Sequence, residues 1–281
     1  GWGLSLLTIG IFSKVVLADG ILAPVVDTVF ENANQVGTFE AWVAVSSFSG
    51  QIFFDFSGYS TCAIGAALCL GFTLPDNFLS PYAAAGFSEF WRRWHITLSS
   101  WLRDYLYVPL GGNRKGSLRT FINILVVMFL GGLWHGASWL FVLWGLLHGC
   151  YLVVEHIVVA AFGGIKAMSH PYLRLVFVLS TFTLVSLSWV LFRSPDMATA
   201  FSLYERLFVV TDTNVFLGSE AGLVILIITV LIFWHHVTSS YRLDQLLIKV
   251  PWWVRASVLG ILLSFIAFST VDDRAFIYFQ F

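Results

Sequence analysis

Histidine is the side chain in this sequence best suited to moving a proton, because imidazole exchanges protons near neutral pH. His135 stands in the run Leu-Trp-His-Gly-Ala, sixteen residues after Arg119 and twenty before Glu155. In one continuous helix it would lie about 24 Å from the first charge and about 30 Å from the second. An ionisable group at that depth in a membrane should face the bundle interior or a hydrated cavity. Two hypotheses stay open: general-base chemistry on a hydroxyl group, or a hydrogen bond that only fixes helix packing.

Two further ionisable residues stand in apolar or aromatic surroundings. His95 shares a helical face with Trp91 and Trp94, so its ring either meets a partner in the protein or reaches the membrane interface. Asp55 stands in the run Phe-Phe-Asp-Phe, where a carboxylate must be paired, protonated or hydrated. For Asp55 we favour a structural role, as partner of an intramembrane arginine or of hydroxyl groups, over catalysis.

The other histidines do not indicate a metal site. His148 follows His135 by thirteen residues, about 220° around an ideal helix, so the two are not expected to share a face. His235 and His236 are adjacent and cannot both point at one site from a regular helix. Because no two histidines have the i, i+4 spacing typical of zinc ligands, we predict no bound metal.

Composition indicates that these residues belong to a membrane protein. Of the 281 residues, 58% are hydrophobic and only 11% are charged, and the mean hydropathy is +0.83. Soluble domains carry about a quarter charged residues, so a soluble enzyme, a nucleic-acid-binding protein and a disordered chain are excluded. We therefore expect membrane lipid as a partner and no nucleic acid. The formal net charge of −1 favours no particular class of further partner.

Uncharged stretches predict six or seven helical membrane segments in one domain covering residues 1–281, because one span needs about 20 apolar residues. The uncharged windows lie at residues 56–75, 120–154, 175–192, 221–241 and 256–271, with further apolar stretches at 2–22 and 41–54. The window 120–154 exceeds one perpendicular crossing, so Gly131-Gly132 in its middle is either a break or a point of close packing. The predicted fold class is an all-α polytopic membrane protein.

The segment at residues 87–106 differs from the spans. Its apolar residues recur at the spacing of one helical face, while Arg92 and Arg93 are among the polar residues on the other positions. Tryptophan and tyrosine are abundant in it, as is typical at the level of lipid headgroups. The pattern predicts one amphipathic helix that lies in the membrane interface or re-enters the protein.

Basic residues gather in the same part of the chain. Six of the fifteen lysines and arginines fall between residues 88 and 120, which places residues 87–116 on the cytoplasmic side. Asn113 and Arg114 stand there in a glycine-rich loop that could hold a phosphorylated donor. A topology signal is the alternative that we favour for this loop.

Several runs of the sequence together carry a family resemblance that covers most of the chain. They are residues 54–60 (FDFSGYS), 88–99 (SEFWRRWHITLS), 101–114 (WLRDYLYVPLGGNR), 131–137 (GGLWHGA), 144–149 (WGLLHG) and 276–281 (FIYFQF). The chain resembles the membrane-bound O-acyltransferase family, in the branch that contains the bacterial alginate O-acetylases and the D-alanyl transfer protein of teichoic acid synthesis. In this family the chain would begin after several N-terminal spans. The family also commonly has an acidic residue and Met after Ser60, where this chain has Thr61-Cys62.

The resemblance implies roles for particular residues. The histidine of the Leu-Trp-His-Gly motif is taken as catalytic in the family, which here is His135. The histidine of the Arg-Arg-Trp-His motif lines the same reaction chamber, which here is His95. Supporting or substrate-binding roles are expected for Asp55, Trp134, Arg92, Arg93, Asn113 and Arg114.

The function that the resemblance implies is acyl transfer at the bacterial inner membrane for modification of an extracellular polysaccharide. O-acetylation, as of alginate, is favoured over D-alanyl transfer to teichoic acid. The donor would be a cytoplasmic thioester, acetyl-CoA or an acyl carrier, used as a substrate with no bound cofactor. The partners would be a periplasmic or extracellular acetyltransferase and the polysaccharide acceptor. Two other classes stay open on the residues: a transporter or flippase that uses buried His and Asp, and a non-catalytic membrane scaffold.

Overall fold

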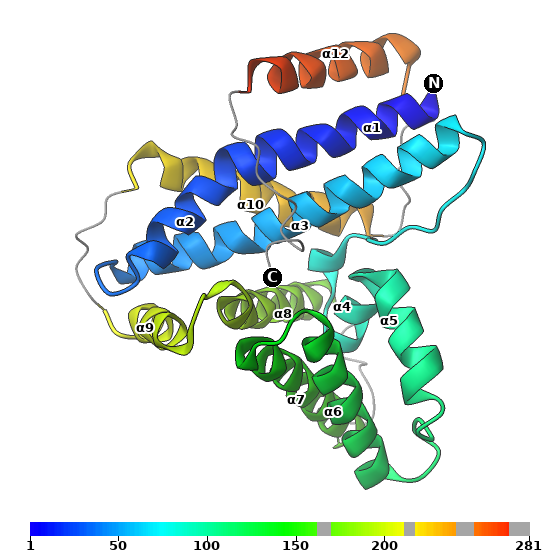
Figure 1. Ribbon diagram of the computed structural model, residues 1–281, viewed down its shortest axis with the longest axis vertical. Helices are drawn as coiled ribbons and strands as arrows, with labels where there is room; N and C mark the ends of the chain where they lie inside the picture. The colour runs from blue at the N-terminus through cyan, green and yellow to red at the C-terminus, as the bar shows by residue number, and fades with distance from the viewer. Residues whose placement is uncertain (162–169, 211–216, 240–249, 270–281) are drawn as a thin grey trace. The chain divides into compact units, whose positions relative to one another are not determined.

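The computed structural model describes residues 1–161, 170–210, 217–239 and 250–269. These residues form helices and no strand, which confirms the all-α prediction. The longer helical elements are α1 (Trp2–Phe12), the π-helical η1 (Ser13–Leu22), α2 (Ala23–Glu31), α3 (Thr38–Cys69), α6 (Ser117–Trp134), α7 (Trp139–Ala161), α8 (Pro171–Arg193), α9 (Met197–Phe208), α10 (Ser219–Thr238) and α12 (Trp252–Phe268) (Figure 1). The short ones are η2 (Pro81–Ala83), α4 (Phe87–Arg93), α5 (Ile96–Leu102) and η3 (Arg103–Tyr107). The run 276–281 that contributed to the family resemblance lies outside the described residues.

Within the described ranges, six helical stretches are long and apolar enough to cross a membrane, so the prediction of a multi-pass membrane protein is confirmed. They are Trp2–Glu31, Thr38–Cys69, Ser117–Trp134, Trp139–Ala161, Pro171–Arg193 and Ser219–Thr238. The stretches predicted at 41–54 and 56–75 belong to one helix, because α3 continues through Asp55.

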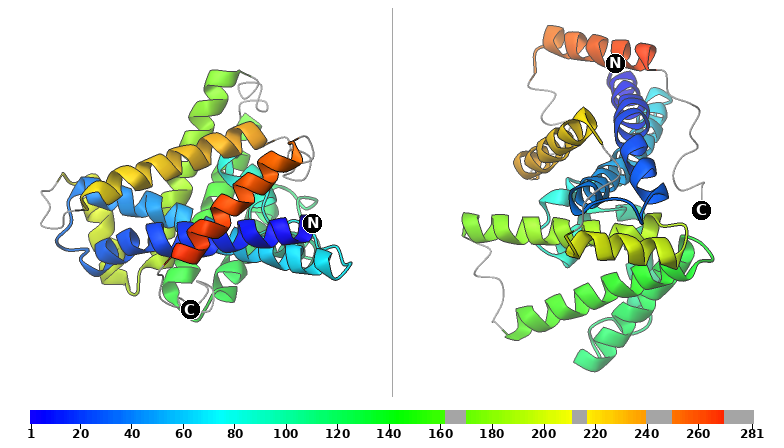
Figure 2. Two further views of the ribbon diagram at one scale, coloured as in Figure 1. Left: turned by 90° about the horizontal axis from the view of Figure 1, so that it is seen from above. Right: turned by 90° about the vertical axis from the view of Figure 1, so that its left-hand side faces the viewer.

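One compact unit contains Gly1–Leu79 and Phe201–Phe281. In this unit α1 and α3 run side by side, as the two views of Figure 2 show. A Cβ atom added at Gly10 would lie 2.6 Å from the carbonyl oxygen of Gly58, so only glycine permits this approach of the two backbones. The close contact lets two long apolar helices pack without intervening side chains.

The second compact unit is Ser80–Ala200, in which α6 and α7 form an antiparallel hairpin (Figure 1). A Cβ atom on Gly132 would clash with the carbonyl oxygen of Phe141, and one on Gly145 would clash with that of Met128. Gly132 is therefore a point of close packing. The long window 120–154 is interrupted as predicted, but the break falls at residues 135–138. The prediction of a single domain for the whole chain stays a prediction.

The prediction of one amphipathic helix over residues 87–106 is wrong. Helix α4 ends before Trp94, and His95 adopts a left-handed backbone conformation with φ of 44° before α5 begins. Such a conformation costs about 1–3 kcal/mol. The turn buries Trp94, whose ring stacks on Phe90 with 5.5 Å between centroids. Ser99 Oγ donates a hydrogen bond of 3.1 Å to the carbonyl of Trp94, and these contacts offset the cost of the turn.

Candidate active site

His135 follows the last residue of α6 and lies in the short connection to α7. The depth expected from one continuous helix is therefore wrong, because the chain reverses direction at residues 135–138. The imidazole is partly buried against two aromatic rings: its centroid lies 5.2 Å from that of Trp144 and 5.1 Å from that of Phe192, both edge-on. The ring is thus positioned by α7 and α8 as well as by its own connection.

His95 and His135 lie near enough for a charge on one to affect the other, although forty residues separate them in sequence. Burial lowers the pKa of His135 to about 3, and the positive charge that the nearby His95 ring can carry lowers it as well. Burial also lowers the pKa of His95 to about 4. The hydroxyl of Thr97 lies 3.4 Å from Nδ1 of His95. Both imidazoles are neutral at pH 7, and a neutral imidazole can accept a proton.

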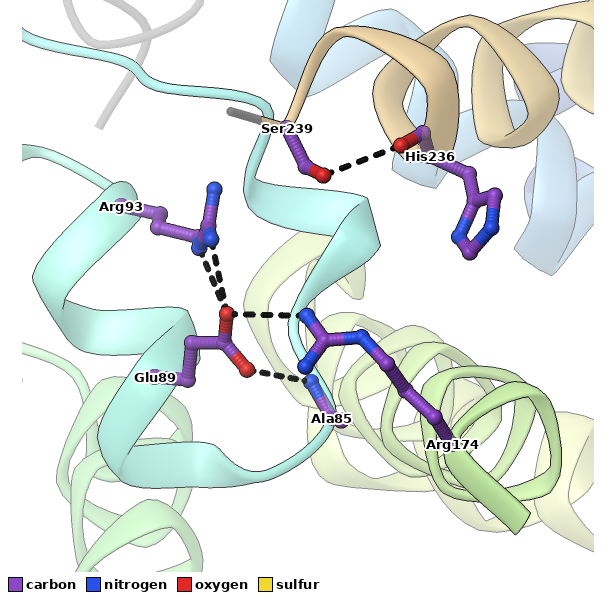
Figure 3. Close-up of polar contacts among 6 residues, drawn as sticks. All are labelled: Ala85, Glu89, Arg93, Arg174, His236 and Ser239. Atoms are coloured by element: carbon purple, nitrogen blue, oxygen red, sulfur yellow. Dashed lines mark hydrogen bonds and ion pairs between the residues drawn. The ribbon is translucent and has the colours of Figure 1, made fainter. Parts of the chain in front are cut away.

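Charged groups anchor α4, the helix that leads into His95. Glu89 Oε1 accepts hydrogen bonds of 3.0 and 2.8 Å from Nε and Nη2 of Arg93, and one of 3.4 Å from Arg174 of α8 (Figure 3). Its Oε2 accepts one of 2.9 Å from the backbone N–H of Ala85. Partial burial raises the pKa of Glu89, but these donors outweigh it and the net shift is downward. Arg93, predicted to support substrate, is thus a partner in this structural ion pair.

A second carboxylate holds the first turn of α4. Oε2 of Glu155, on α7, accepts hydrogen bonds from the backbone N–H groups of Phe87 at 2.5 Å and Ser88 at 3.1 Å. Unpaired N–H groups and the helix dipole make a helix N-terminus favourable for negative charge. Glu155 therefore joins α7 to the start of the segment that carries His95. These bonds could not be predicted from the sequence, since they join residues 67 and 68 positions apart.

Four other predicted residues lie at exposed positions. The side chains of Arg92 and Trp134 are exposed, the second with 69% of its surface accessible. Asn113 and Arg114 are exposed in the loop before α6. This loop precedes the first residue of α6 and His135 follows its last, so about 27 Å of helix separates them. The structure does not bring this loop to the two histidines.

Asp55 lies on α3 in the other compact unit and forms an ion pair with Lys14 of η1. Lys14 Nζ also contacts Asp19 Oδ1 at 2.9 Å. A buried carboxylate needs such a cation, because an unpaired charge in a low-dielectric interior is strongly disfavoured. The contact agrees with the structural role that we favoured, although the cation is a lysine instead of an arginine.

His148 is fully buried, and its position relative to His135 differs from the prediction. The angle of 220° between His135 and His148 assumed one helix, whereas the break at residues 135–138 puts both rings against Trp144. The centroid of His148 lies 4.9 Å from that of Trp144, and its Nε2 lies 2.8 Å from Ser188 Oγ. The run Gly-Ala-Ser at residues 136–138 was the signal for the break, since Gly136 has φ of 152°.

The titratable side chains of this site include imidazoles that pack against aromatic rings. They can accept a proton and hold a hydroxyl group. Among the described residues, no three His, Cys, Asp or Glu side chains are grouped so that they could hold a metal ion. The absence of a bound metal stays a prediction.

A multi-pass helical fold with two histidines brought together defines a membrane protein with a candidate site for proton transfer. The chain belongs to the membrane-bound O-acyltransferase family, whose family model matches residues 3–194. This confirms the resemblance inferred from the motifs.

Three relatives with curated descriptions show the range of the family branch. The chain is 41% identical over 236 residues to "probable alginate O-acetylase AlgI" of Azotobacter vinelandii, covering 84% of this chain and 46% of that protein. It is 42% identical over 210 residues to "peptidoglycan O-acetyltransferase" of Helicobacter pylori, covering 72% and 38%. It is 34% identical over 115 residues to "teichoic acid D-alanyltransferase" of Streptococcus thermophilus, covering 37% and 27%. The chain thus spans less than half the length of these relatives.

Proposed function

We propose that this chain belongs to an O-acyltransferase that transfers an acetyl group for O-acetylation of an exported polysaccharide such as alginate. Two of the relatives, described as an alginate O-acetylase and a peptidoglycan O-acetyltransferase, match 84% and 72% of the chain. The D-alanyltransferase matches only 37% of it. This difference favours an acetyl group over D-alanine as the group transferred.

The proximity of His95 to the buried His135 is the observation that supports the proposal most directly. His135 would accept the proton of an acceptor hydroxyl group. The hydroxyl oxygen would at the same time attack the carbonyl carbon of an acyl thioester. A C–O bond forms, the C–S bond breaks, and the proton passes from His135 to the departing thiolate. His95 would position or polarise a reactant. General-base catalysis of this kind contributes about 10²–10⁴-fold to a rate.

We further propose a place and partners for this reaction. The protein would lie in the bacterial inner membrane, with the basic residues between 88 and 120 on the cytoplasmic side. The donor would be acetyl-CoA or an acyl carrier thioester from the cytoplasm. The acceptor would be the polysaccharide itself or a periplasmic or extracellular acetyltransferase that passes the group on.

Label transfer tests the proposed class of reaction. Membranes containing the complete gene product would receive a thioester donor labelled in its acetyl group, together with the polysaccharide acceptor. The proposal predicts labelled ester on the polymer that is released by mild base. A transporter or flippase would move its substrate and leave it chemically unchanged. A D-alanyl thioester, labelled in its D-alanyl group and supplied in a parallel reaction, separates the two acyl groups.

A further inference from the structure

A cluster of buried ring nitrogens surrounds His148 on α7. Its ring centroid lies 5.2 Å from Trp91, 4.9 Å from Trp144 and 6.3 Å from Trp189. His148, Trp144 and Trp189 are at most 2% exposed. These four side chains come from α4, α7 and α8, all within the unit Ser80–Ala200. We call the side chains of His148, Trp91, Trp144 and Trp189 the His148 cluster.

The hydrogen bonds of Ser188 fix which nitrogen of His148 carries the proton. Ser188 Oγ donates its single proton to the carbonyl oxygen of Val185, at 2.6 Å. The contact of 2.8 Å between Ser188 Oγ and His148 Nε2 must therefore be donated by an N–H on Nε2. A neutral imidazole has only one N–H group, so Nδ1 of His148 presents a bare lone pair and is a hydrogen-bond acceptor.

The His148 cluster contains one acceptor and three donors whose hydrogen-bonding capacity the protein leaves unused. Nδ1 of His148 and the Nε1–H groups of Trp91, Trp144 and Trp189 are buried without a hydrogen-bond partner in the described part of the chain. Each such group is destabilising, and native proteins rarely leave several side by side. A single hydroxyl group can satisfy both an acceptor and a donor of the cluster, because it donates to Nδ1 and accepts from an indole N–H.

We propose that the His148 cluster binds a small O–H group, which donates to Nδ1 of His148 and accepts from an indole N–H of the cluster. The group is a water molecule or a hydroxyl of the acceptor substrate, which offer the same hydrogen bonds. The indole of Trp144 also contacts His135, so this site adjoins the candidate base. Binding at the His148 cluster does not depend on the proposed acyl transfer.

Electron cryo-microscopy of the complete protein, at a resolution that reveals ordered water, tests this proposal directly. We expect an oxygen density within about 3.2 Å of His148 Nδ1. Maps recorded with and without a short oligosaccharide acceptor separate the two sources. Density in both maps identifies water, and density only with the acceptor identifies its hydroxyl. No density in either map overturns the proposal, whether or not the protein transfers acetyl groups.

Two substitutions separate the roles of the two nitrogens of His148. In His148→Asn the amide oxygen can replace Nδ1 as an acceptor, but the bond to Ser188 is lost. In His148→Gln the amide nitrogen can still donate to Ser188, but the Nδ1 acceptor is lost. The proposal predicts that the oxygen density remains in the Asn variant and disappears in the Gln variant. The reverse pattern contradicts it, and the wild-type maps decide the question where a variant does not fold.

Discussion

The properties of the two central histidines come from their surroundings as much as from their residue type. An isolated histidine is about half protonated near pH 6.5. Here burial lowers the pKa of His95 to about 4 and that of His135 to about 3. A base whose pKa is lowered keeps its free lone pair as the pH falls. Both rings therefore stay able to accept a proton well below neutral pH.

The lowered pKa values of His95 and His135 predict an unusual pH dependence of acetyl transfer. The initial rate of the solubilised complete protein should stay level between pH 7.5 and pH 5, because neither His95 nor His135 gains a proton in that range. A histidine with the ordinary pKa of 6.5 would lose about tenfold in rate by pH 5.5. Rates measured with saturating donor and acceptor, with folding monitored at each pH, check this. A titration midpoint near pH 6.5 would contradict the lowered pKa values.

At the residue scale, the sequence predicts which residues belong to the candidate site better than it predicts which residues contact them. The motifs singled out His95 and His135, and the structure brings these two rings together. The roles of Glu155 and His148 could not be predicted, because their contacts join residues 40 or more positions apart. The ion pair between Glu89 and Arg93 has the i, i+4 spacing and could have been found.

At the scale of elements, the break between α4 and α5 places His95. Helical periodicity over residues 87–106 predicted one continuous helix. Periodicity shows which face is apolar, but it does not detect a single residue with a left-handed backbone conformation. Burial of Trp94 and the hydrogen bond from Ser99 favour the turn. The same limit applies to the window 120–154. Its length showed that it exceeds one membrane crossing, but composition could not show at which residues the helix breaks.

The turn predicts different effects for two substitutions of His95. Asparagine tolerates the left-handed conformation, whereas a β-branched residue is strongly disfavoured there. We expect His95→Val to lower the free energy of unfolding by about 1–2 kcal/mol more than His95→Asn. Both variants lose the imidazole, so their loss of activity should be similar. Thermal unfolding in detergent measures the difference, and equal stabilities would argue against a strained backbone at this residue.

The α6–α7 hairpin depends on the glycine contact at its centre. In Gly145→Ala the added Cβ would clash with the backbone oxygen of Met128, so the helices must move apart. We expect a destabilisation of about 1–3 kcal/mol. Gly222→Ala on α10 is the matched control, because its Cβ would meet nothing within 4 Å. The control should gain about 0.5–1 kcal/mol, and equal unfolding temperatures for the two variants would count against this packing.

At the scale of the whole molecule, composition predicted the membrane class and the helical fold. The apolar windows predicted several spans, but they divided α3 in two and joined α6 with α7. Which helices associate could not be read from these windows. Residues 1–79 and 201–281 belong to one compact unit, joined for example by Trp42 Nε1, which donates to the carbonyl oxygen of Leu207 at 3.0 Å. Such associations depend on specific side-chain contacts between distant segments, which apolar periodicity does not encode.

The role proposed for His135 is that of the base in an acetyl transfer reaction. The most direct test expresses the complete gene in a host that lacks its own polysaccharide acetylase, and measures acetyl ester on the exported polymer. Wild type, His135→Ala and His156→Ala would be compared at matched membrane levels, since His156 is an exposed histidine on α7. We predict a loss of about 10²–10⁴-fold in transfer for His135→Ala and wild-type ester for His156→Ala. Wild-type amounts of ester from His135→Ala would contradict the account.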